Sequence, residues 1–175
     1  SEQVDHLLGI AFDDLRDYYR EPDVRNRVRD RLVRALQRHE GKNICLIAHS
    51  MGSIIAYDVL RMMEHRPTAI DHLVTIGSPL GLPIVTQHIR EEFSNTTVPH
   101  QVRHWTNLAD PGDKGALDCS LTDDYRPTPG GVQVQDDLIH NGYVDRSGNN
   151  DRHNSYGYLR TPELSDIVRE FLASE

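Results

Sequence analysis

Short apolar runs alternate along this sequence with longer segments that have the periodicity of a helix. Residues 43–48 and 72–76 are short apolar runs, which are typical of strands buried on both faces of a parallel sheet. Residues 52–63 and 84–93 follow them and repeat apolar residues at the three- and four-residue spacing of a helix. This alternation predicts an α/β architecture, with a mostly parallel sheet flanked by helices.

The same two patterns predict the remaining elements. Helices are expected over 5–19 and 23–39, strands over 101–107 and 132–134, and a loop over 108–131. The last helix is expected to have Thr161 as its N-cap and Pro162 in its first turn, followed by a single apolar stripe. Because the 175 residues show no internal repeat or linker, we expect one domain over residues 1–175.

The charge balance narrows the class of protein. Acidic residues outnumber basic ones by 27 to 19, for a net charge of −8, which argues against nucleic acid as a partner. Six arginines between Arg25 and Arg38 are expected to form a solvated helix face. No run reaches the roughly 18 apolar residues of a membrane span, and no signal peptide pattern opens the sequence. The two cysteines, Cys45 and Cys119, are far apart and favour a reducing, cytoplasmic location.

A serine stands where the first expected strand meets a helix, in the pentapeptide Ala48-His49-Ser50-Met51-Gly52. This fits the pattern G-x-S-x-G with alanine in the first position, a sharp turn that lifts a serine hydroxyl clear of the sheet. The pattern predicts small residues two before and two after Ser50, and it directs the amide of Met51 toward a developing oxyanion. The alternative is that Ser50 only caps the helix.

A serine nucleophile needs a base, and the base needs an acid that orients it. With this serine turn the acid follows the serine in the chain and the base comes last. Asp110 and Asp113 follow the third expected strand, so both are expected at the carboxyl edge of the sheet. Asp113 is favoured because the Pro111-Gly112 turn holds it further over the edge, and Asp110 is the alternative acid. The carboxylate that is not used is expected to cap the turn.

Ten histidines compete for the role of base. Only His140 and His153 follow both aspartates in the chain. His153 is favoured because it stands in a polar loop just before the last helix, and His140 is the alternative. His49 adjoins Ser50, but neighbouring side chains in such a turn are expected to point apart.

Over residues 43–172 the sequence resembles the α/β-hydrolases of the lipase and esterase kind. The resemblance rests on the order of four motifs: Ala-His-Ser-Met-Gly-Ser at 48–53, Gly-Ser-Pro-Leu at 77–80, Trp-Thr-Asn followed by Asp-Pro-x-Asp at 105–113, and a histidine followed by Tyr-Gly-Tyr-Leu at 153–159. The second aspartate of the third motif looks like the acid position of the family, which supports Asp113.

The resemblance implies a serine hydrolase acting on a small-molecule or lipid ester without a metal or cofactor. Ser50 would attack the carbonyl, His153 would accept and later donate the proton, and Asp113 would orient the imidazole. The amide of Met51 would form half of the oxyanion hole. Leu80 and Leu82 are expected to line an acyl pocket. The alternative function is a catalytically silent binding or interaction module.

The sequence departs from this family before Ser50. The family normally places several strands there, whereas only 49 residues precede Ser50 and about the first 40 are helical in pattern. We therefore expect a fold that is reduced on its N-terminal side, with a bare apolar edge on the 44–48 strand. Either the chain is the C-terminal part of a larger hydrolase, or a second copy or another partner covers that edge.

Overall fold

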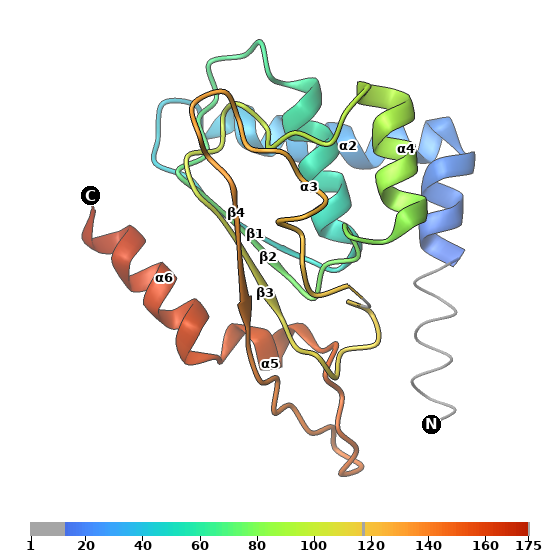
Figure 1. The fold of residues 1–175 in the computed structure, drawn as a ribbon, viewed down its shortest axis with the longest axis vertical. Coiled ribbons are helices and arrows are strands. Elements are labelled where there is room, and N and C mark those ends of the chain that lie inside the picture. The colour runs from blue at the N-terminus through green and yellow to red at the C-terminus, as the bar shows by residue number, and fades with distance from the viewer. Residues whose placement is uncertain (1–12, 117, 175) are drawn as a thin grey trace.

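A four-stranded, entirely parallel sheet forms the centre of the molecule, as the alternating pattern predicts (Figure 1). The computed structural model describes residues 13–116 and 118–174. The strands lie in chain order across the sheet: β1 (Cys45–His49), β2 (His72–Ile76), β3 (Trp105–Ala109) and β4 (Val134–Leu138). All four point the same way, so the loops that follow them gather at one edge of the sheet.

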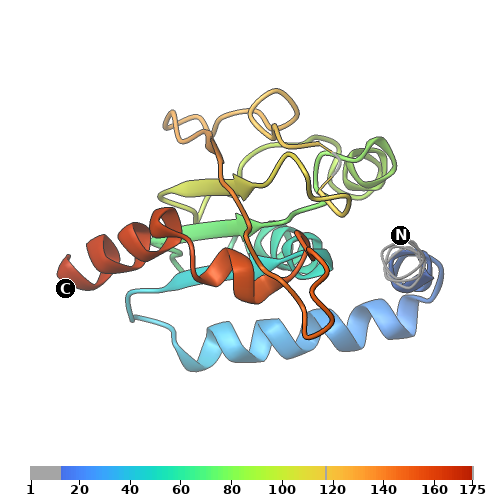
Figure 2. The same ribbon diagram turned by 90° about the horizontal axis from the view of Figure 1, so that it is seen from below.

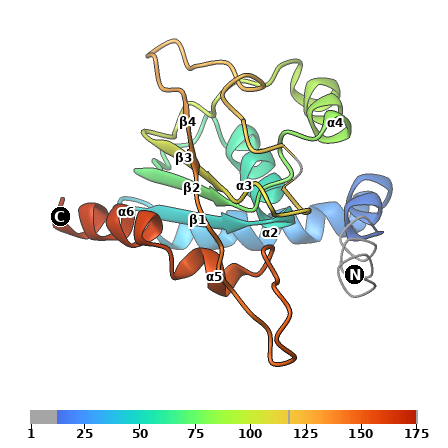
Figure 3. The same ribbon diagram turned by 60° about the horizontal axis from the view of Figure 1, so that its bottom comes forward.

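Helices cover both faces of this sheet (Figures 1 and 3). One face carries α2 (Pro22–Arg38), α3 (Met51–Met62) and α4 (Pro83–Phe93), and the other carries α5 (Ser155–Leu159) and α6 (Pro162–Ala173). Figure 2 shows α2 running along the β1 side of the domain. Residues 13–20 are also helical, and residues 5–12 of the helix expected over 5–19 lie outside the described part of the chain.

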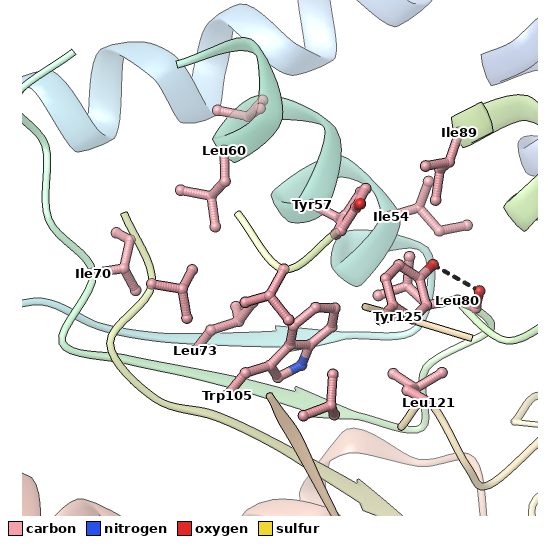
Figure 4. Close-up of a cluster of buried hydrophobic side chains, with 14 of the residues drawn as sticks. Ile54, Tyr57, Leu60, Ile70, Leu73, Leu80, Ile89, Trp105, Leu121 and Tyr125 are labelled. Atoms are coloured by element: carbon pink, nitrogen blue, oxygen red, sulfur yellow. Dashed lines mark hydrogen bonds between the residues drawn. The ribbon is translucent and has the colours of Figure 1, made fainter. Parts of the chain in front are cut away.

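Alternation along the strands divides the core into two clusters. Leu73 of β2 and Trp105 of β3 face α3 and α4, where they pack with Tyr57 and Tyr125 (Figure 4). Val74, one residue after Leu73, and Leu108, three residues after Trp105, point to the opposite face and belong to the cluster under α5 and α6. A strand buried on both faces is a nearly continuous apolar run rather than an alternating one, which is why residues 72–76 indicate a strand. The polar Thr75 is fully buried and donates to Asn107 of β3 at 2.9 Å.

The edge strand β1 corrects the prediction for the first apolar run. Among the described residues β1 pairs only with β2, and Ile47 is 36% exposed. The 43–48 run was expected to be buried on both faces, but only Ala48 of β1 is fully buried. The physical reason is that an edge strand has a neighbour on one side only. The bare apolar edge expected on this strand is therefore present in the described part of the chain.

Two strands begin later than predicted, because backbone groups of Val102 and Val132 form hydrogen bonds within turns rather than with a neighbouring strand. Val102 makes only an isolated bridge to Ile70, and the strand expected from 101 begins at Trp105. The strand expected over 132–134 begins at Val134, since Val132 closes a turn with Thr128 by hydrogen bonds in both directions. The polar continuation of β4 and the short helix α5 were not predicted.

One arginine of the expected solvated face is buried instead. Arg29 is 2% exposed and donates to Asp58 at 2.7 Å and to both carboxylate oxygens of Glu92 at 2.6 and 2.8 Å. The Tyr18 hydroxyl completes this network, because it accepts from Arg29 and donates to Asp58. The network joins α2, α3 and α4 through polar contacts inside the core. Among residues 13–116 and 118–174, no helix combines the length and apolar character needed to cross a bilayer.

Candidate active site

Ser50 occupies a strained turn between β1 and α3. Its backbone has φ 52° and ψ −130°, a conformation that costs a non-glycine residue on the order of 1–3 kcal/mol and is concentrated at functional sites. The Ser50 amide donates to the carbonyl of Ile76 at 3.1 Å, and the buried Ser53 hydroxyl donates to the Ser50 carbonyl at 2.6 Å. These contacts hold the turn on both sides while the side chain stays partly exposed.

The expected steric need for glycine at position 52 is not observed. A Cβ placed on Gly52 meets no atom within 4 Å in the described part of the chain. Within the described ranges there is room for at least a methyl group at position 52, whereas Ala48 is buried, as the predicted tight fit around Ser50 requires.

The structure brings Ser50, His153 and Asp113 into one hydrogen-bonded chain. Nε2 of His153 lies 2.8 Å from Oγ of Ser50, although the two residues are 103 positions apart. Nδ1 of the same ring lies 2.9 and 3.0 Å from the two carboxylate oxygens of Asp113. Because a carboxylate only accepts, Nδ1 carries the proton of the neutral ring and Nε2 accepts from the serine hydroxyl.

Asp113 is held on every side. Its side chain is fully buried, Oδ1 accepts from the Gly115 amide at 2.7 Å, and Oδ2 accepts from the Tyr158 hydroxyl at 2.7 Å. Burial and the neighbouring Asp113 charge raise the pKa of Tyr158 well above its ordinary value, so the phenol stays protonated and donates. Tyr158 lies on α5, which was not predicted, so this hydrogen-bond partner of Asp113 was missed.

Two glycines allow the close approach of these groups. A Cβ on Gly115 would overlap the imidazole of His153, and a Cβ on Gly77 would lie 2.9 Å from Oδ2 of Asp113. Gly77 also has φ 53°, which favours glycine directly. Gly77 belongs to the Gly-Ser-Pro-Leu motif, while nothing in the sequence around Gly115 distinguishes it from an ordinary loop glycine.

The alternative acid and base lie next to one another, away from Ser50. Asp110 is 1% exposed and caps the turn by accepting from the Gly112 amide at 2.7 Å, and it also contacts Arg152 at 3.0 Å. Burial raises the pKa of Asp110, but the hydrogen bonds from Gly112, Asn141 and Arg152 outweigh it and hold this pKa below its ordinary value. His140 is exposed, and its Nδ1 lies 3.1 Å from Arg152. The structure does not bring either residue into contact with Ser50.

Of the other predicted site residues, Met51 and Leu82 are placed where the prediction needs them and Leu80 is not. Met51 is the first residue of α3, so its amide is one of the first-turn donors that have no partner within the helix. Leu80 is fully buried in the core, and its carbonyl accepts from the Tyr125 hydroxyl, which leaves it no surface to offer an acyl chain. Leu82 is half-buried at the N-cap of α4 and keeps an accessible side chain.

His49 contacts the His153 loop, although it was expected only to point away from Ser50. Its Nε2 lies 2.8 Å from the backbone carbonyl of His153, and the two imidazole rings are 4.8 Å apart. Burial, followed by the nearby His153, lowers the pKa of His49 below its ordinary value, so a neutral ring donates to this carbonyl. Its position beside Ser50 was the available signal, but only the fold brings the His153 loop above it.

The molecule also has two adjoining cavities, of about 490 and 290 Å³, at the opposite end of the sheet. Both are lined by His72, Arg103 and His104, and neither touches Ser50, Asp113 or His153. Within the described ranges, no group of three or more histidine, cysteine, aspartate or glutamate side chains is arranged to hold a metal ion.

A parallel sheet with a strained serine turn at its carboxyl edge defines an α/β protein of the hydrolase-like class. Residues 16–138 match the family model described as the PGAP1-like alpha/beta domain, so the chain belongs to this family, within the alpha/beta hydrolase-like superfamily. The matched range includes Ser50 and Asp113 and ends before His153. Neither a search of curated proteins nor a search of solved structures finds a match.

Proposed function

We propose that this protein is a serine hydrolase that cleaves a carboxylic ester through Ser50, His153, Asp113 and an acyl-enzyme. The observation that carries the proposal is the 2.8 Å contact between His153 Nε2 and Ser50 Oγ. The buried carboxylate of Asp113 on the other ring nitrogen supports it. Membership of an alpha/beta hydrolase-like family supports the reaction class.

In the first step, Oγ of Ser50 attacks the ester carbonyl carbon while Nε2 of His153 accepts the hydroxyl proton. The new bond joins Oγ to the carbonyl carbon, and the carbonyl electron pair moves onto its oxygen. Positioned proton transfer of this kind contributes about 10²–10⁴ in rate. Asp113 stabilises the imidazolium that forms and holds its orientation, because its two oxygens face Nδ1 at 2.9 and 3.0 Å.

The tetrahedral intermediate places a negative charge near the start of α3. The Met51 amide and the helix N-terminus stabilise this charge, and one such donor is worth about 10²–10³ in rate. The imidazolium of His153 then protonates the leaving alcohol as the carbon–oxygen bond breaks, which leaves an acyl group on Ser50. Water, activated by the same imidazole, releases the acid and restores the hydroxyl of Ser50.

The substrate class is a small-molecule or lipid ester whose acyl group lies near the start of α4. Leu82 is half-buried there, and the neighbouring Ile84 is 50% exposed. Leu82 and Ile84, rather than the buried Leu80, are the apolar side chains that follow Gly77 and are accessible to an acyl group. The chemistry requires no metal or cofactor, because the general base and the oxyanion donor come from the chain itself.

A fluorophosphonate probe tests the proposal without knowledge of the natural substrate. The probe forms a bond between its phosphorus and the activated serine oxygen, and fluoride leaves. We expect labelling of Ser50 that Ser50→Ala abolishes and that Ser165→Ala, a control on α6, leaves unchanged. A folded wild-type protein that takes up no probe and does not hydrolyse p-nitrophenyl butyrate would refute the proposal.

The second candidate function is a catalytically silent binding module. The observation that favours it is the β1 edge, where Ile47 is exposed and no further strand pairs in the described part of the chain. A second copy or another partner would add a strand there. Absence of labelling, together with a dimer mass by light scattering that Ile47→Lys converts to a monomer, would favour this function.

A further inference from the structure

The loop that carries His153 has little apolar anchorage. Between β4 and α5 the chain runs through residues 139–154 and projects away from the sheet (Figures 1 and 3). Ile139, at its start, is the buried hydrophobic residue of this loop. A catalytic imidazole has to be held within a fraction of an ångström, so polar contacts must supply the position that packing does not.

One buried amide holds the backbone on both sides of His153. Nδ2 of Asn141 donates to the carbonyl of Arg152 at 2.8 Å and to the carbonyl of Asn154 at 2.9 Å. Asn141 is 1% exposed, and its Oδ1 accepts from the Tyr143 amide at 3.1 Å. Both protons of this amide are therefore used on the two residues that flank the imidazole.

One buried carboxylate joins this loop to the turn that carries the acid. The Asp110 carboxylate accepts from the backbone amide of Asn141 at 2.6 Å and from Nη1 of Arg152 at 3.0 and 3.2 Å. The Asp110 carbonyl also accepts from the amide of Asp113 at 2.9 Å. Asp110 thus touches the residue before His153, the start of its loop and the backbone of Asp113.

Arg152 crosses directly over the turn between the two aspartates. A Cβ on Gly112 would lie 2.6 Å from Cδ of Arg152, so the aliphatic part of the arginine lies against this glycine. The Arg152 side chain is one-third exposed, whereas that of Asp110 is almost completely buried. The arginine therefore closes the outer side of the junction and neutralises the buried charge.

We propose that Asp110, Asn141 and Arg152 form a clamp that positions His153 between Asp113 and Ser50. The clamp deepens the proposed function and rests on it, since its purpose is to hold the general base. None of the three residues hydrogen-bonds to Ser50; they are positioning residues that act through His153. Asp110 is a member of the clamp rather than the orienting acid.

The variant Arg152→Met tests the clamp, because methionine retains much of the aliphatic length and loses both contacts to Asp110. A misplacement of about 1 Å costs about 10²-fold in rate, so we expect fluorophosphonate labelling to slow by about 10²-fold. With p-nitrophenyl butyrate the loss should appear in kcat, with KM unchanged. Arg152→Lys keeps a cation within reach of Asp110 and should restore the rate to within about tenfold of wild type.

A proton NMR signal separates positioning from a general loss of stability. The proton on Nδ1 of His153, shared with Asp113, should give a resonance far downfield in the wild type. We expect Arg152→Met to lose this resonance while the thermal midpoint shows a folded protein, and Arg152→Lys to keep it. Arg169→Met, which removes an exposed ion pair with Asp166 on α6, is the matched control and should change neither readout.

The outcomes distinguish failure of the clamp from failure of the proposed function. A folded Arg152→Met with wild-type labelling and an unchanged resonance overturns the clamp. A wild type that is neither labelled nor active on p-nitrophenyl butyrate, but whose resonance is lost in Arg152→Met, refutes the hydrolase and supports the clamp. If Arg152→Met does not fold, Arg152→Gln, which retains a neutral donor, replaces it. Its labelling rate and its downfield resonance are then judged by the same criteria.

Discussion

Gly115 provides the sharpest test of the contact geometry around the imidazole. Its backbone does not adopt a positive φ, so Gly115→Ala places no strain on the chain. The added methyl group, however, would overlap the ring of His153. The ring cannot retreat toward Asp113, because Nδ1 already lies 2.9 Å from Oδ1. The imidazole must therefore move relative to Ser50.

The size of the effect follows from the displacement. Relief of the overlap requires a shift of roughly 1 Å, which takes Nε2 out of its 2.8 Å contact with Ser50 Oγ. A shift of this size costs about 10²-fold in rate, equivalent to about 2.7 kcal/mol of lost transition-state stabilisation. The free energy of unfolding should change much less, because His153 is partly exposed and belongs to neither hydrophobic core cluster.

The assay is the second-order rate of fluorophosphonate labelling, measured beside a urea unfolding curve. Gly130→Ala is the matched control, since the nearest atom to its added Cβ is 3.7 Å away, an ordinary contact. A folded Gly115→Ala protein that is labelled at the wild-type rate would refute the assigned position of His153 against Gly115. Equal losses of labelling rate in Gly115→Ala and Gly130→Ala would refute the specificity of the contact.

Three further predictions concern strain, a buried ion pair and pH. Ser50→Gly should abolish labelling and stabilise the fold by about 1 kcal/mol in urea, because glycine adopts the positive φ of this turn without strain; a destabilised variant would contradict the strain. Arg29→Met should cost about 3–5 kcal/mol in the same assay, because it leaves Asp58 buried without its cation. A loss below about 1 kcal/mol would show that the network is not needed. Asp110 has a lowered pKa in the folded state, so its contribution to stability is present above about pH 4, the unfolded value, and is lost as the pH falls through the folded value. The free energy of unfolding should then fall more steeply with acid in the wild type than in Asp110→Asn, and equal slopes would contradict this.

The elements with strong local patterns were predicted closely. β2 has the expected bounds, and α3 and α4 each begin one residue before the expected start. The helix α6 begins at Pro162 with Thr161 as its cap, and the Thr161 hydroxyl accepts from the Leu164 amide. In these segments burial, propensity and capping all favour the same structure, so the local sequence is enough to predict the type and bounds of each element.

The strand β4 shows where a local pattern fails. Residues Gln135, Asp136 and Asp137 are not typical of a strand, yet they pair in register with β3. The reason is that Asp136 accepts from Asn107 and from the amides of Leu121 and Thr122. These partners come from a neighbouring strand and a distant loop, so no window around Asp136 contains the signal.

The alternation of strands and helices, the serine turn, and the short set of candidate acids and bases could all be predicted from the sequence. Those features depend on neighbours within a few residues, through periodicity, turn geometry and chain order. The contacts themselves follow from the folded arrangement: His49 bonds to the backbone carbonyl of His153, Tyr158 donates to Asp113, and Arg29 is buried against Asp58. Such contacts join segments tens of residues apart, and their free energy depends on packing and desolvation, which exist only once the chain has folded.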